Sequence, residues 1–128
     1  MLDAVLPKYP SAALYRVRGQ VHQDAAQLPE AVHCLERAVE LDPFEQKSHY
    51  LMGQAYSGVG RPDDAARSFA RVESLKKSLD RMTVLTKEAM EKPTDGKVRL
   101  ELAELSEALG KPKLALMWRK AAAACDDP

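Results

Sequence analysis

The chain has 128 residues, of which 45% are hydrophobic, 30% charged and only 5% aromatic. Lys and Arg balance Asp and Glu at 19 each, so the positive excess of a nucleic-acid-binding protein is missing and no nucleic-acid partner is expected. No apolar run is long enough to predict a membrane span, and the N-terminus lacks the basic start and apolar core of a secretory signal.

The two cysteines, Cys34 and Cys125, lie far apart in the sequence and form no CxxC pair. This pattern favours reduced thiols over a disulfide or a metal site. Reduced thiols without a secretory signal predict a cytoplasmic protein.

The first ten residues carry a short apolar turn that Pro7 and Pro10 interrupt. We expect residues 1–10 to be a partial N-terminal cap or the remainder of a truncated repeat.

A helical hairpin is predicted next. Ser11 is a suitable N-cap for a first helix over about residues 12–25. Pro29 suits the first turn of a second helix, where a missing N–H costs little. Asp42 and Pro43 end that second helix.

A second hairpin follows directly. Its first helix, over about residues 45–58, ends at Gly58 and Gly60. Pro62 and two aspartates then open the next helix, and acidic groups in a first turn are favoured by the helix dipole.

This next helix is predicted to be unusually long, because residues 63–92 contain no Gly or Pro. A continuous helix of this size would be about 45 Å long. The alternative is a break near Asp80 to Thr83, where Thr and Val lower the helix propensity. We favour one continuous helix.

The second half of the long helix bears an apolar stripe formed by Leu79, Met82, Leu85 and Ala89. If the last hairpin folds back on this stripe, the chain is a monomer. Otherwise two copies pair along it as a coiled-coil-like homodimer. We favour the fold-back, since the last hairpin otherwise has no surface to pack against.

The last hairpin is predicted to begin at Thr94, as the N-cap of a helix over about residues 95–109, and to turn at Gly110. The outer side of its second helix is apolar, with Leu116 and a run of alanines. Repeat arrays usually end in a polar capping helix. An exposed apolar strip is therefore expected, which a partner or the neighbouring repeats of a longer chain would cover.

Two registers relate the three hairpins, and spacings of this size indicate stacked two-helix units. At 34 residues the matched pairs are Gly19 and Gly53, His22 and Tyr56, Ala31 and Ala65, and Leu35 and Phe69; at 50 residues they are Gly60 and Gly110, Pro62 and Pro112, and Ala65 and Ala115. The matched glycines suggest close approach of a partner helix, and the matched alanines suggest the small residues that face it.

On these residues the chain resembles the tetratricopeptide repeat (TPR) family, over residues 14–43, 48–79 and, more weakly, 98–128. The sequence departs from the family pattern at Ala26, which stands where the other two hairpins have Gly, and at Val72 and Ala103.

The resemblance implies an all-α, right-handed α-solenoid of helix-turn-helix repeats. We expect a first repeat at 11–43, a second with an elongated second helix at 44–92, and a third at 93–128. Such a fold implies a non-catalytic scaffold that binds a protein or peptide.

No residue pattern predicts catalysis, a cofactor or a metal. His22 matches Tyr56 and is interpreted as a packing residue, His33 as exposed, and His49 as lying near the hairpin contact. No His or Cys pair has ligand spacing, and no phosphate-binding loop occurs. We expect no enzymatic activity.

The resemblance implies that the first helix of each hairpin lines a concave groove. The predicted peptide-binding residues are Arg16, Gln20, Lys47, Tyr50, Leu51, Gln54, Lys97, Glu101 and Glu104, accompanied by Ala13, Val17 and Leu100. This groove is basic at one end, apolar in the middle and acidic at the other, which suits a peptide of mixed charge. Because the sequence contains no Asn, capture of a C-terminal carboxylate by Lys and Asn side chains, known in the family, is not expected.

Two alternatives remain open at the level of sequence. Binding or self-association could use the long helix and the last helix instead of the groove. The chain could also be a regulatory or docking module of a larger enzyme or assembly.

Overall fold

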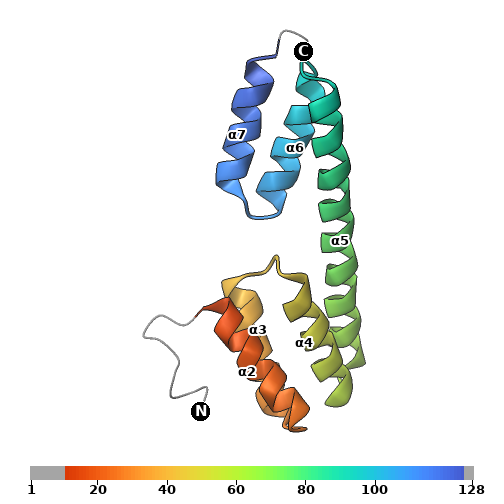
Figure 1. The fold of residues 1–128 in the computed structure, drawn as a ribbon. Helices are drawn as coiled ribbons and strands as arrows, with labels where there is room; N and C mark the ends of the chain where they lie inside the picture. The colour runs from red at the N-terminus through yellow and green to blue at the C-terminus, as the bar shows by residue number, and fades with distance from the viewer. Residues whose placement is uncertain (1–10, 126–128) are drawn as a thin grey trace. The chain divides into compact units, whose positions relative to one another are not determined.

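The computed structural model describes residues 11–125 (Figure 1). They form six helices and no strand: α2 (Ala12–Asp24), α3 (Leu28–Leu41), α4 (Gln46–Gly58), α5 (Pro62–Glu91), α6 (Gly96–Ala108) and α7 (Pro112–Ala123). The predicted all-α class is confirmed. The interpretation of residues 1–10 as a cap or truncated repeat lies outside the described residues.

The chain divides into two compact units, one ending at Ser74 and the other beginning at Leu75. The boundary falls inside α5, which is one helix of 30 residues, so the predicted continuous helix is confirmed over a break near Asp80. The hydroxyls of Thr83 and Thr86 donate to the carbonyls one turn earlier, at 3.1 Å and 2.7 Å, so their polar groups are satisfied within the helix.

The same turn recurs in all three hairpins. Ala26, Gly60 and Gly110 have φ values of 60°, 79° and 74°, the left-handed region that terminates helices. In each turn the next residue's amide donates to a carbonyl five residues back, as Gln27 does to His22 at 2.8 Å. The structural repeat therefore coincides with the sequence registers.

The helix glycines accommodate a bulky side chain of the second helix in their hairpin. A Cβ on Gly19 would lie 2.7 Å from Cγ of Leu35, and one on Gly53 would lie 2.6 Å from Cε1 of Phe69. The second helix of each hairpin thus lies close to the first, as predicted, and its contact with the glycine is made by the Leu35 or Phe69 side chain. In the third hairpin Ala103 takes the glycine position. The residue that matches Phe69 at the 50-residue spacing, which we call its register mate, is the exposed Arg119.

The core of the first unit joins its two hairpins. Its buried residues come from α3, α4 and the start of α5: Ala31, Val32, Leu35, Leu51, Met52, Ala55, Tyr56 and Ala65. The matched alanines Ala31, Ala65 and Ala115 are 0%, 3% and 0% exposed. They are core residues at equivalent places, as the registers predict.

In the second unit, the last hairpin packs on the second half of α5. Leu85 and Ala89 are 1% and 2% exposed and form one core with Val98 and Leu102, against which Trp118 packs. The predicted fold-back of this hairpin onto the apolar stripe is confirmed for these residues.

Two side chains define the junction between α5 and α6. Asp95, and not the predicted Thr94, caps α6, because its carboxylate accepts from the amides of Lys97 and Val98 at 3.0 Å and 3.2 Å. The guanidinium of Arg99 donates to the carbonyls of Ala89, Lys92 and Asp95 at 2.8–3.0 Å. Arg99 therefore supplies the positive charge that the last turn of α5 lacks.

Candidate peptide-binding surface

Six of the nine predicted groove residues lie in the first unit, on the first helix of each of its hairpins. Arg16 and Gln20 lie on α2, and Lys47, Tyr50, Leu51 and Gln54 lie on α4. We call this the α2–α4 surface.

Arg16 is committed to an ion pair within the fold. Its Nη1 contacts Oε1 of Glu45, the residue that immediately precedes α4, and both side chains are about three quarters buried. This pair links the two hairpins of the first unit. It also neutralises the charge of Arg16, so this residue does not act as a free cation toward a ligand.

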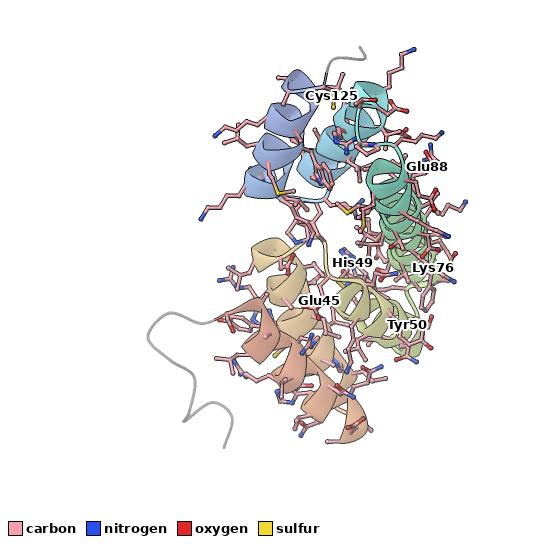
Figure 2. All side chains as sticks on the ribbon, turned by 45° about the horizontal axis from the view of Figure 1, so that its top comes forward. Glu45, His49, Tyr50, Lys76, Glu88 and Cys125 are labelled. Carbon is pink, nitrogen blue, oxygen red and sulfur yellow. The ribbon has the colours of Figure 1, made fainter. Side chains whose placement is uncertain are left out.

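Gln54 joins α2 to the aromatic part of the surface. Its Nε2 donates to the Tyr50 hydroxyl at 3.3 Å, and its Oε1 accepts from Gln23 at 3.5 Å. The Tyr50 ring lies 5.8 Å from the Phe69 ring, at a tilt of 59°. Tyr50, labelled in Figure 2, is nonetheless 47% exposed, so it is held in place and available to a ligand.

The surface is apolar beside these polar groups. Val17 and Val21 on α2 are 38% and 51% exposed. Lys47 is exposed, whereas Leu51 is 7% exposed and belongs to the core, where it supports the surface from below.

The other three predicted residues lie on α6, in the second unit. Glu101 accepts from Nε and Nη2 of Arg81 at 3.0 Å and 3.2 Å, and its carboxylate raises the pKa of Arg81. Lys97 and Glu104 are exposed. Within this unit the ion pair ties α6 to α5.

Sequence reasoning missed Glu45, Gln23 and Arg81, the partners that hold Arg16, Gln54 and Glu101. Each partner lies on another helix or at its cap. No periodic signal marks such pairs. The register mate of Gln54 is Gln20, yet the hydrogen bond is made by Gln23, one turn further along α2.

The histidines and cysteines are placed as follows within the described residues: His33 is exposed, as predicted, and lines a cleft with His22 and Cys34. His49 is buried and donates from Nε2 to the Pro43 carbonyl at 2.8 Å, and neither cysteine forms a disulfide. Residues 11–125 contain no cluster of His, Cys, Asp or Glu that could hold a metal ion. None of the helices described is long and apolar enough to cross a membrane.

Tyr56 has the clearest electrostatic perturbation. Burial, followed by a 2.7 Å hydrogen bond to the Glu36 carboxylate, raises its pKa to about 12. The guanidinium of Arg61 lies 4.5 Å from the ring centre. These contacts join α4 to α3 within the first unit and serve packing, which matches the predicted role of this position.

Comparison with known proteins gives the fold. No protein-family model and no curated protein matches the sequence. A crystal structure of MamA matches 88% of this chain with 20% identity and a TM-score of 0.50. A MamA mutant matches 99% of the chain with 24% identity and a TM-score of 0.49, covering 82% of its own length.

The chain spans 57% of the length of the first of these MamA chains. The likeness agrees with the repeated turns and matched core alanines. The fold is an all-α, TPR-like array of helical hairpins.

Proposed function

We propose that the protein is a non-catalytic scaffold whose α2–α4 surface binds a segment of a partner protein. The observation that carries the proposal is Tyr50, which is 47% exposed while its hydroxyl and ring are both held by neighbours. A fixed, half-exposed aromatic ring gives contact area at low entropic cost, as binding hot spots do.

The chemistry of the surface suggests the ligand. Val17, Val21 and Tyr50 offer apolar contact, and Lys47 offers one positive charge, since Arg16 is neutralised by Glu45. A peptide segment with apolar side chains next to an acidic one suits these groups.

The proposal is tested with a peptide selected from a random library on the full chain. Changing Lys47→Glu together with Tyr50→Ala should abolish binding of that peptide while the chain stays folded; the melting temperature should fall only slightly, because Tyr50 is half exposed but also packs on Phe69. The control is Lys76→Glu with Val84→Ala on α5, which changes an exposed lysine and an exposed apolar residue. Binding retained in the first variant and lost in the second would move the site to α5.

The alternative of a regulatory or docking module within a larger enzyme or assembly uses the same surface and shares this test. The alternative of a coiled-coil seam along α5 has less apolar area at its disposal, since Leu85 and Ala89 are buried in the second unit.

A further inference from the structure

Hairpins 1 (α2 and α3) and 3 (α6 and α7) correspond residue by residue through a register of 84 residues. Ala31 and its mate Ala115 are both fully buried, and Ala26 and its mate Gly110 have the same left-handed turn conformation. What covers a residue in hairpin 1 is therefore a guide to what its mate in hairpin 3 could bind.

In hairpin 1 one face is covered by α4. Val32 on this face is 7% exposed and belongs to the core that α3 shares with α4. One turn further along α3, Glu36 accepts a hydrogen bond from the Tyr56 hydroxyl of α4 at 2.7 Å. An apolar contact and a polar contact one turn apart thus hold α4 in place.

In hairpin 3 the corresponding residues are exposed. The mate of Val32 is Leu116, which remains apolar yet is 52% exposed, and the mate of Glu36 is the exposed Lys120. The same hairpin bears a cleft of about 330 Å³, lined by Gly96, Leu100, Arg119, Ala122, Ala123 and Cys125. The hairpin 1 residue that matches Leu100 is Arg16, which contacts Glu45 at the start of α4, so the cleft lies toward the position that α4 takes in hairpin 1. The third hairpin has the apolar contact but the opposite charge.

The charge of this face selects the occupant. Within α7, Lys113, Arg119 and Lys120 are basic and no residue is acidic. Arg119 pairs with Glu107 of α6, while Lys113 and Lys120 are exposed. A covering helix must therefore carry an acidic residue where α4 carries Tyr56.

A second copy of the chain does not meet this requirement. Head-to-tail stacking would place hairpin 1 of one copy on hairpin 3 of the next, with Arg18 and His22 as the mates of Met52 and Tyr56. Arg18 would then face Leu116, and His22 would face Lys120. A symmetric pairing of two α7 helices would oppose lysines, which is unfavourable.

We propose that the exposed face of hairpin 3, centred on Leu116 and Lys120, binds an acidic amphipathic helix of a partner protein in the position that α4 takes on hairpin 1. The helix presents apolar residues to Leu116 and the cleft, and a carboxylate to Lys120. This site is separate from the α2–α4 surface.

The probe is a labelled synthetic peptide of residues 44–59, the α4 sequence, with Tyr56→Glu. A second peptide with Tyr56→Lys, which carries the opposite charge at this position, is the control. Binding to the full chain is measured by fluorescence anisotropy. The wild type should prefer the Glu peptide, and Lys120→Glu should reverse the preference, each by about fivefold, since an exposed attraction is exchanged for a repulsion.

Two variants on α7 control for the apolar contact. Leu116→Gln should weaken both peptides, whereas Met117→Gln should weaken neither, because Met117 is equally exposed but its mate His33 lies outside the covered face. Circular dichroism confirms that each variant folds. The Lys47→Glu, Tyr50→Ala variant should bind the probe like the wild type, which separates this site from the proposed groove.

Three results would overturn the proposal. The first is no binding tighter than about 1 mM. The second is binding that does not respond to residue 116 or 120. The third is a wild-type dimer in sedimentation that Leu116→Gln converts to a folded monomer, because the occupant would then be a second copy.

Discussion

Ala26 has the backbone conformation that Gly60 and Gly110 adopt in the other two turns. For a residue with a Cβ, this left-handed conformation costs about 1–2 kcal/mol. Glycine avoids this cost, but its greater conformational entropy in the unfolded state offsets part of the gain. We expect Ala26→Gly to stabilise the chain by about 0.5–1 kcal/mol in urea unfolding.

The reciprocal change is the control for this prediction. A Cβ on Gly60 would meet no atom within 4 Å, so Gly60→Ala tests the backbone conformation alone. It should destabilise the chain by about 1 kcal/mol. If Ala26→Gly and Gly60→Ala changed the free energy of unfolding in the same direction, residues 26 and 60 would not share this turn conformation.

Tyr56 gives a pH-dependent test of a single side chain. Its pKa is raised from the usual value near 10 to about 12 in the fold. A raised pKa contributes stability below pH 10 that is lost as the pH rises through 12. The unfolding free energy of the wild type should therefore fall more steeply over this range than that of Tyr56→Phe. Parallel pH profiles for the two proteins would refute the raised pKa, which rests first on the burial of Tyr56 and then on its hydrogen bond to Glu36.

Among the helices, Ala65 reports on the packing of α5 against α4. It is 3% exposed in the core that includes Ala55 and Leu51. Ala65→Leu should destabilise the chain by about 1–3 kcal/mol through overpacking. The neighbouring Ala66 is exposed, so Ala66→Leu should leave the unfolding free energy nearly unchanged. Equal effects of the two substitutions would show that this face of α5 is not packed as described.

Arg99 tests how the end of α5 is held. It donates to three carbonyls at the C-terminal end of α5 and the following turn, and such charged hydrogen bonds are worth about 1.5–3 kcal/mol. Arg99→Met should speed amide hydrogen exchange in the last turns of α5, while Lys97→Met, two residues away and exposed, should not. Unchanged exchange in both variants would remove Arg99 from this role.

The elements themselves could be predicted closely from the sequence, because caps and turn glycines are local signals. The helix predicted over 45–58 is Gln46–Gly58, and the one predicted over 95–109 is Gly96–Ala108. The apolar contacts between helices could be predicted in part, whereas the polar contacts could not. The Arg16–Glu45 pair and the Arg99 contacts depend on helix separation and rotation, which no periodic pattern encodes.

The candidate surface shows the same limit of sequence reasoning. Tyr50 and Leu51 are neighbours, and both were assigned to the groove. One residue is a rotation of about 100° on a helix, and that rotation takes Leu51 into the core while Tyr50 stays 47% exposed. The matched registers therefore do not determine which of two neighbouring side chains is exposed.

For the whole molecule, the repeated hairpins present two separate candidate binding surfaces among the residues described. The α2–α4 surface belongs to the first unit, and the exposed face of α7 belongs to the second. Each can be altered by exposed substitutions that leave the cores untouched. Substitutions on either surface are therefore expected to weaken partner binding with little effect on the free energy of unfolding.

Backbone-amide NMR of the full chain, titrated with the library-selected peptide, locates the binding surface residue by residue. We expect saturable shift changes on α2 and α4 that are absent in the Lys47→Glu, Tyr50→Ala variant, and these changes should be largest around Val17, Gln20, Lys47, Tyr50 and Gln54. Shift changes confined to α5, α6 and α7, with α2 and α4 unperturbed, would contradict the proposed α2–α4 surface.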